Sequence, residues 1–232
     1  MTAVRPGRFL DFRRTELAAR RAGKPIADYL EEIWHCEGQA DRISGWMQEI
    51  GCYQSCNTIL EIGPGSGRFL SQTLDRASPT RYEIYETARS WAEWLASSHS
   101  PYVIIQPADG WSLCATPTAS CQLVHAHGVF VYLKLLTCFE YFAEMIRVAS
   151  PHAHIIFDFF PSESFDERAV SAWLASKDRF ATLLPRNLVI NFFQSRGFYL
   201  LATCNRSVGP GQATYLAFRN SGKTYVHKES AD

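Results

Sequence analysis

Glycines at positions 63, 65 and 67 are the residues of this chain whose type and spacing most directly predict chemistry. They follow an apolar stretch, residues 58–62, that contains the carboxylate of Glu61 and has the composition of a short strand. Because glycine adopts positive φ and has no Cβ, a ligand can lie against its backbone in such a turn. A helix that begins after the turn adds unpaired N–H groups. The segment therefore predicts a ligand-binding turn, with a glycine-rich turn of no function as the alternative.

Two more acidic residues stand where predicted strands end. Glu86 closes the predicted strand 81–86, and a carboxylate at this position can accept hydrogen bonds from both hydroxyls of a ribose. Thr87, the next residue, is of a type that caps a following helix. Asp109 follows the third predicted strand, although Asp-Gly is also an ordinary turn pair. These residues predict polar contacts to a nucleotide-like ligand, with solvated strand ends as the alternative.

A pair of histidines, His125 and His127, lies at the end of the fourth predicted strand. Residues two apart in a strand point the same way, so both side chains face one side of the sheet. A histidine near its ordinary pKa is suited to taking a proton from a hydroxyl group. The spacing also fits two ligands of a metal ion, with Asp158 as the nearest third ligand, but we expect no metal. A purely structural pair is the remaining alternative.

The elements that position these residues alternate between strands and helices from residue 58 onward, which predicts a parallel sheet. The last two strands have only a short connection and therefore predict an antiparallel hairpin. Helices are expected on both faces, and Pro151 is expected to end the helix before the fifth strand. The expected strands are 58–62, 81–86, 102–106, 122–126, 154–159, 198–204 and 215–219, and the expected helices include 9–21, 26–34, 40–50, 67–74, 135–148 and 188–194.

The spelling Glu61-x-Gly63-x-Gly65-x-Gly67 resembles the first motif of the class I S-adenosylmethionine-dependent methyltransferases. A dinucleotide turn needs G-x-G-x-x-G, and Arg68 occupies the place of its third glycine, which disfavours a nicotinamide oxidoreductase. The resemblance covers residues 55–220. It implies a seven-stranded, mostly parallel Rossmann-like sheet and S-adenosylmethionine as cofactor, leaving S-adenosylhomocysteine. It also implies that the cofactor contacts Glu61, Gly63, Pro64, Gly65, Gly67, Glu86, Thr87, Ala108, Asp109, Gly110 and His125, with Asp109 accepting the adenine amino proton.

The family's fourth motif lines the reaction centre, and here it reads His-Ala-His-Gly where amino-group methyltransferases carry Asn/Asp-Pro-Pro-Tyr. This departure disfavours methylation of nucleic-acid bases. The favoured reaction is O-methylation of a small hydroxylated acceptor, a sugar or natural product, with His127 as first candidate for the base and His125 as second. N- or S-methylation and a non-catalytic cofactor-binding module are the alternatives. The acceptor is expected to contact Tyr132, Asp158, Tyr29, Trp34, Trp173 and Arg179.

The composition of the chain limits the classes of partner and the cellular location that can be expected. Lys+Arg and Asp+Glu balance at 23 each, so no net field draws the chain to nucleic acid. No apolar run is long enough to span a bilayer and the N-terminus lacks an apolar leader, which predicts a cytoplasmic protein. Seven cysteines without a C-x-x-C pair indicate reduced thiols and no zinc site. We expect a helical cap over residues 1–54, a core over 55–232 and a helical insert at 162–185. The oligomeric state is left open, with a homodimer as one option.

Overall fold

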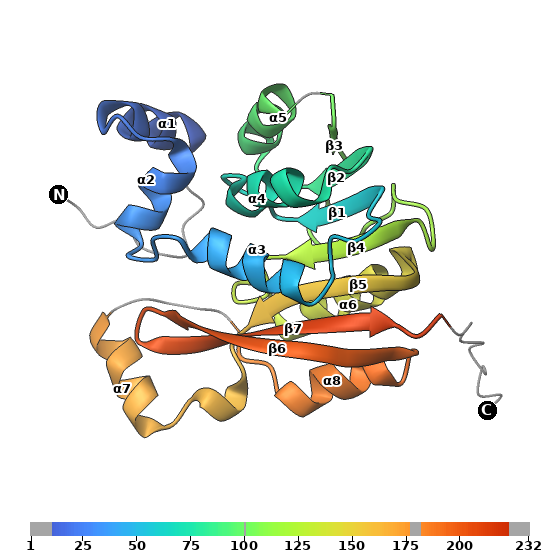
Figure 1. Ribbon diagram of the computed structural model, residues 1–232. Coiled ribbons are helices and arrows are strands. Elements are labelled where there is room, and N and C mark those ends of the chain that lie inside the picture. The colour runs from blue at the N-terminus through green and yellow to red at the C-terminus, as the bar shows by residue number, and fades with distance from the viewer. Residues whose placement is uncertain (1–10, 100, 177–181, 223–232) are drawn as a thin grey trace.

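A computed structural model describes residues 11–99, 101–176 and 182–222 (Figure 1). Its centre is one seven-stranded sheet of β1 (Thr58–Ile62), β2 (Arg81–Tyr85), β3 (Val103–Ile105), β4 (Cys121–Ala126), β5 (Ala149–Phe159), β6 (Phe198–Val208) and β7 (Gly211–Asn220). The strand order is β3-β2-β1-β4-β5-β7-β6. The first five strands pair in parallel, and β7 pairs antiparallel with both β5 and β6. The predicted Rossmann-like sheet with a C-terminal hairpin is confirmed.

Helices cover both faces of this sheet. The described helices are α1 (Phe12–Arg21), α2 (Ile26–Ile33), α3 (Gln39–Glu49), α4 (Arg68–Ala77), α5 (Arg89–Ser98), α6 (Leu135–Val148), the short 3₁₀ helix η1 (Ser162–Ser164), α7 (Glu167–Ser176) and α8 (Arg186–Gln194). Apolar residues of α3, α4 and α5 pack on one face, and those of α6 and α8 pack on the other. Within the described ranges, no helix has the length and apolar character needed to cross a membrane.

The two faces differ because neighbouring strand residues point to opposite sides. On the α6–α8 face the strands present Phe157, Phe159 and Phe218, all fully buried, to aromatic residues of the helices. On the α3–α5 face the apolar positions are interrupted, toward the carboxyl ends of the strands, by buried polar residues such as Glu61 and His125. Alternation along each strand therefore separates an aromatic core from the predicted site.

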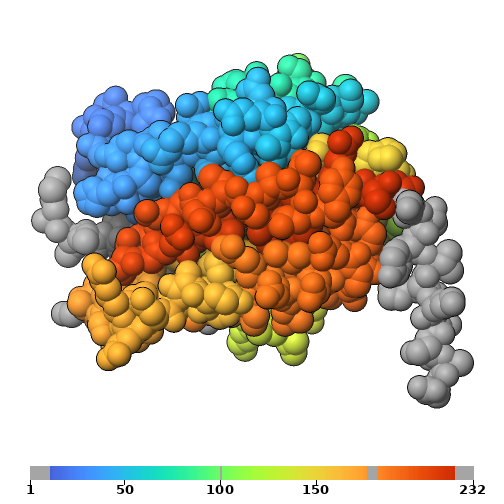
Figure 2. Space-filling view, turned by 60° about the horizontal axis from the view of Figure 1, so that its bottom comes forward, coloured from blue at the N-terminus to red at the C-terminus, as the bar shows by residue number. Residues whose placement is uncertain are grey.

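The N-terminal helices are joined to the sheet by their own contacts. Phe12 of α1 packs on Trp91 and Trp94 of α5, with ring centroids 5.1 and 5.6 Å apart. Trp46 of α3 packs on Tyr215 of β7 at 6.2 Å. Figure 2 shows the β6–β7 hairpin, in orange to red, crossing the surface beside these blue helices. The division of the chain into a cap and a core at residue 55 stays a prediction.

Two local predictions are wrong. Pro151 does not end a helix: α6 stops at Val148 and β5 begins at the next residue, with Pro151 exposed inside the strand. A proline is tolerated there because the β4–β5 register is irregular between Cys121 and Leu123, so no regular ladder bond is lost. The hairpin strands are also longer than predicted. The prediction of β6 stopped too early because residues in its second half alternate between exposed and half-buried and carry no apolar signal.

Candidate cofactor and reaction site

The three glycines of the turn after β1 have different surroundings. All have positive φ, at 61° for Gly63, 53° for Gly65 and 70° for Gly67. A Cβ on Gly63 would lie 2.8 Å from Val129 Cγ2, and one on Gly67 would overlap the Leu95 side chain. A Cβ on Gly65 would meet nothing within 4 Å. The outer glycines are therefore required by packing, whereas Gly65 leaves open space beside the backbone, as a ligand-binding turn requires.

Glu86 joins this turn to the end of β2. Its Oε2 accepts a hydrogen bond from the Gly65 N–H at 2.9 Å and its Oε1 accepts one from the Ala88 N–H at 2.8 Å. Burial raises the pKa of this carboxyl, while the backbone N–H groups around it oppose the shift. The carboxylate thus braces Gly65, and its contact with a ribose stays a prediction. Thr87 does not cap α5: it is exposed, and the N-cap is Ala88, without a side-chain bond.

The third carboxylate, Asp109, is exposed after β3 and shapes its own turn. Its Oδ1 accepts hydrogen bonds from the N–H groups of Trp111 and Ser112, at 2.9 and 2.8 Å. Gly110, between Asp109 and Trp111, has a φ of 94°, which a residue with a side chain would rarely adopt. The loop is therefore fixed by Asp109, and the predicted cofactor contacts of Ala108, Asp109 and Gly110 stay predictions.

Glu61 is buried beneath the glycine turn and begins a chain of hydrogen bonds. The Tyr82 hydroxyl from β2 donates to Glu61 Oε2 at 2.6 Å. The same hydroxyl lies 2.9 Å from Nε2 of His125 on β4. Glu61, Tyr82 and His125 are each no more than 1% exposed. The three side chains come from three adjacent strands and point into the same face of the sheet.

The chain continues through the second histidine. His125 Nδ1 lies 2.8 Å from His127 Nε2, and His127 Nδ1 lies 3.2 Å from the hydroxyl of Tyr215. The ring of Phe69, at the start of α4, stacks on His127 with centroids 3.6 Å apart and planes 9° apart. His127 keeps some accessible surface, whereas Tyr215 is fully buried. Both nitrogens of both histidines thus have a hydrogen-bond partner.

Burial sets the charge of these groups. Desolvation lowers the pKa of His125 to about 3 and holds that of His127 well below its usual range. Desolvation also raises the pKa of Glu61 to about 8, although the bond from Tyr82 opposes the shift. At neutral pH both histidines are therefore neutral, each with one proton on its ring, and Glu61 is the group whose charge changes near that pH.

Two ion pairs lie on either side of this series of hydrogen-bonded side chains. Asp158 at the end of β5 is fully buried; its Oδ2 accepts from Arg206 of β6 at 2.5 Å and its Oδ1 from the Gly128 N–H at 2.6 Å. Arg206 also donates to Gln39 Oε1 of α3 at 3.0 Å. On the other side, Arg68 pairs with Glu31 of α2 at 3.2 Å. These pairs join the N-terminal helices to the strand ends.

Asp158 is not placed as a third metal ligand, because its carboxylate is bound to Arg206 and Gly128. Within the described part of the chain, Glu61, His125 and His127 are the one set of metal-ligating side chains whose ligand atoms lie within 4.8 Å of one another. However, the 2.8 Å between the two histidine nitrogens is a hydrogen-bond distance, so one of them carries a proton. The expectation of no metal stays a prediction.

The predicted acceptor residues fall in different surroundings. Tyr132 is 42% exposed on the loop after β4, and Tyr29 is half-buried on α2. Trp34 is half-buried under the guanidinium of Arg68, 4.9 Å from its ring centroid. Trp173 is buried in a small cluster with Val131, Phe160 and Ala213, which ties α7 to the hairpin. Arg179 lies outside the described residues.

Sequence reasoning missed the residues that connect the site. Tyr82, Tyr215 and Arg206 lie inside strands. In a strand, a tyrosine is usually interpreted as a core residue, and a polar residue that alternates with apolar ones is usually interpreted as a surface residue. The signal that could have found Tyr82 is its spacing from Glu86 in the predicted strand 81–86, since residues four apart in a strand share a face; in the structure Glu86 directly follows β2. Nothing in the sequence of β7 or β6 distinguishes Tyr215 or Arg206 from other strand residues.

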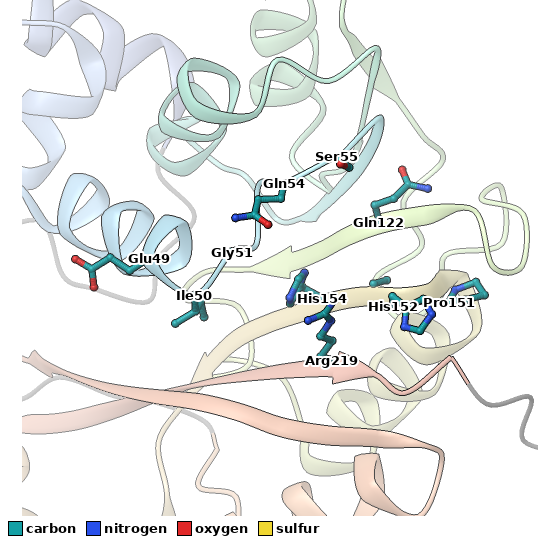
Figure 3. A pocket seen from close by; sticks show the side chains of 11 residues that line it. Glu49, Ile50, Gly51, Gln54, Ser55, Gln122, Pro151, His152, His154 and Arg219 are labelled. Carbon is teal, nitrogen blue, oxygen red and sulfur yellow. The ribbon is translucent and has the colours of Figure 1, made fainter.

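The hollow shown in Figure 3 lies at the opposite, amino ends of β4 and β5, away from the predicted site. Its volume is about 570 Å³. His154 and Arg219, which are register partners on β5 and β7, lie side by side in it. Other residues around it are Glu49, Ile50, Gly51, Gln54, Ser55, Gln122, Pro151 and His152.

Several solved methyltransferase structures are similar to this fold. An O-methyltransferase family protein from Burkholderia thailandensis matches with a TM-score of 0.62 and 16% identity, over 92% of this chain and 63% of that one. A putative sarcosine dimethylglycine methyltransferase from Galdieria sulphuraria gives 0.62 and 11%, over 80% and 85%. Magnesium protoporphyrin IX methyltransferase from Synechocystis PCC 6803, with bound S-adenosylhomocysteine, gives 0.60 and 12%, over 79% and 82%. No family model matches the chain, and no curated protein matches it.

The chain has the fold of the class I S-adenosylmethionine-dependent methyltransferases. It spans 63% of the length of the Burkholderia protein. At these sequence identities the likeness defines the architecture, and the chemistry has to be argued from the residues at the carboxyl ends of the strands.

Proposed function

We propose that this protein is an S-adenosylmethionine-dependent methyltransferase that methylates a hydroxyl group of a small molecule. The observation that carries the proposal is the turn at Gly65, which is open on its ligand side and braced by Glu86. A Cβ at Gly65 would fill the space in which a cofactor would lie against the backbone, so the residues present fit the group. When bound, S-adenosylmethionine supplies an electrophilic methyl group to the acceptor oxygen.

The chain's own residues would then position the acceptor and remove its proton. Positioning supplies much of the rate of such a displacement. His127 is the proposed base, because its ring is neutral and the residue, directly after β4, is only partly buried, and His125 contacts it from below. Asp158 holds the Gly128 N–H and so fixes the residue directly after His127.

The acceptor would be enclosed by the loop after β4 and by the N-terminal helices. Tyr132 and Trp34 offer aromatic surface, and Tyr29 and Trp173 lie on the elements that would border the acceptor. A small-molecule partner, rather than nucleic acid, is supported by the balanced charge of the chain. A cytoplasmic location belongs to the same proposal.

Two other functions use the same fold. N- or S-methylation needs no base. The buried histidine pair argues against it only because a neutral imidazole has one nitrogen without a proton, which can accept the proton of a hydroxyl group. A non-catalytic module would bind the cofactor without turnover. Both are outcomes of the test below.

The test is a turnover screen with methyl-labelled S-adenosylmethionine against separate sets of sugars, phenols, amines and thiols. The proposal predicts label on a hydroxylated acceptor. Label confined to amines or thiols would replace O-methylation by the first alternative. Cofactor binding without transfer to any set would support the module.

A further inference from the structure

Five buried or partly buried side chains form one unbroken hydrogen-bonded line across the sheet. It runs from Tyr215 on β7 through His127, directly after β4, and His125 on β4 to Tyr82 on β2 and Glu61 on β1. The separations are 3.2, 2.8, 2.9 and 2.6 Å in that order. Each separation is within the range of a hydrogen bond, so a proton can pass between any two neighbours.

The line has two complete arrangements of its protons. With Glu61 ionised, Tyr82 donates to Glu61, and each histidine carries its proton on Nε2 and donates toward Glu61. With Glu61 protonated, every donor is reversed and each histidine carries its proton on Nδ1. One proton entering at His127 converts the first arrangement into the second without leaving a charge on either histidine.

We propose that this line carries the acceptor's proton from His127 to Glu61, so that Tyr82 and His125 are positioning residues of the reaction and Glu61 is its proton sink. The inference rests on the proposed function. His127 is the point of entry because, of the five residues, it alone is only partly buried. Its bond to Tyr215 is also the longest, so an acceptor hydroxyl can replace that partner with the least loss.

The proton balance is complete. The acceptor O–H proton goes to His127 Nδ1, the His127 Nε2 proton goes to His125 Nδ1, and the His125 Nε2 proton goes to the Tyr82 oxygen. The Tyr82 proton goes to the Glu61 carboxylate, which becomes neutral. The acceptor oxygen keeps its electron pair and forms the C–O bond, while the pair of the breaking C–S bond stays on sulfur.

The surrounding charges suit this direction. Burial opposes a positive charge on either histidine, and Arg206 and Arg68 add to that effect at His127. Burial and the neighbouring Glu86 favour the neutral form of Glu61, against the bond from Tyr82 and the charge of Arg68. Arg206 and Arg68 are themselves paired, with Asp158 and Glu31. A proton is therefore better held on Glu61 than on the imidazoles, and the line accepts one only in molecules whose Glu61 is ionised, a fraction that grows as the pH rises.

Tyr82→Phe tests the line, because it removes one hydroxyl and keeps the buried ring. Tyr53→Phe is the matched control: Tyr53 lies in the same apolar cluster, and its hydroxyl contacts Met47 Sδ at 3.6 Å, outside the line. We expect Tyr82→Phe to lower kcat at least about 10-fold with KM for both substrates nearly unchanged, and Tyr53→Phe to have little effect.

Nitrogen-15 NMR of the histidine rings gives a readout that needs no cofactor or turnover. In the unmodified protein both rings should stay neutral and change together from the Nδ1–H to the Nε2–H form as the pH rises through the titration of Glu61. The joint change should survive in Tyr53→Phe and vanish in Tyr82→Phe.

Two results would overturn the relay: tautomers that stay fixed across pH 6 to 9.5, or equal kcat in the two variants. The absence of any hydroxylated acceptor for the unmodified protein would count against the proposed function instead. The tautomer change would then still show whether the line moves a proton.

Discussion

The two faces of the sheet are built from the same strands but differ in what they bury. On the α6–α8 face, Phe157 contacts the rings of Phe130, Phe142 and Phe193, with centroids between 4.6 and 5.4 Å apart. On the α3–α5 face, the residue after Phe157 is Asp158, and Glu61 of β1 points to the same side; both are ionisable and buried. The first face is packed mainly with phenylalanine rings, and the second face adds buried ionisable groups near the carboxyl ends of its strands.

This difference shows where stability and function are separated. Aromatic packing stabilises without needing particular partners for polar atoms. A buried carboxylate or imidazole costs free energy unless its hydrogen bonds are made, so each polar group on the second face depends on its neighbours. A change on the aromatic face should therefore alter stability, whereas a change on the polar face should alter ligand binding, catalysis or pH dependence.

The largest effect should come from His127→Ala. We expect turnover to fall by about 10²–10⁴-fold, the usual contribution of a general base, while cofactor affinity stays nearly unchanged. Steady-state kinetics with the identified acceptor measure it, and His152→Ala, an exposed histidine at the other end of β5, is the control. Full activity in His127→Ala would show that His127 is not the general base.

On the opposite face, Phe157→Ala should lower the free energy of unfolding by about 3–5 kcal/mol, because it leaves a cavity among four rings. Urea denaturation measures the loss, and Phe157→Leu should cost less because it fills more of the space. The folded variant should bind the cofactor as before. A loss of cofactor affinity with unchanged stability would contradict the separation of the two faces.

Glu86→Ala should weaken cofactor binding by about 1.5–3 kcal/mol for each lost hydrogen bond to the charged carboxylate. It also leaves the Gly65 N–H without its acceptor, which loosens the turn. Calorimetric titration with S-adenosylhomocysteine measures the change. Glu93→Ala, which removes an exposed glutamate of α5, is the control. An unchanged dissociation constant in folded Glu86→Ala would exclude its role.

The last effect concerns stability and its dependence on pH. Burial raises the pKa of Glu61 from 4.5 to about 8, so between these values the folded protein binds more protons than the unfolded chain. The contribution of Glu61 to stability therefore falls as the pH rises through this window, by at most about 1.4 kcal/mol per pH unit. His125, with its pKa lowered from 6.5 to about 3, has the opposite effect below pH 6.5.

Glu61→Gln isolates the first contribution. Its free energy of unfolding, minus that of the unmodified protein, should grow between pH 5 and pH 8 in urea denaturation. A difference that stays constant with pH would show that the Glu61 carboxyl is not held neutral by burial.

Much of the fold was predictable because its signals are local. The strand 58–62 matches β1, and the helix 135–148 matches α6, since apolar periodicity and flanking turns define both. The missed parts lack such signals. The second half of β6 alternates between exposed and half-buried residues and has no apolar pattern, and Pro151 lies in a strand only because its pairing with β4 is irregular.

The site was predictable in part, for the same reason. Glu61 and the histidine pair stand at strand ends, where alternation alone places them on one face. Their connection through Tyr82 depends on how β1, β2 and β4 pair, and the bond from Arg206 to Asp158 depends on the position of β6. Such pairings are set by the whole sheet, and no local pattern encodes them.

On the polar face, the proposed function depends first on binding of S-adenosylmethionine at the open glycine turn, at the carboxyl ends of the strands. Calorimetric titration of the unmodified protein and of Gly65→Val with S-adenosylmethionine, S-adenosylhomocysteine and NAD(H) tests it most directly. We expect binding of both adenosyl ligands and not of NAD(H), and loss of that binding in Gly65→Val, where a branched side chain enters the open space at a φ of 53°. Measurable NAD(H) binding without a response to either adenosyl ligand would contradict it.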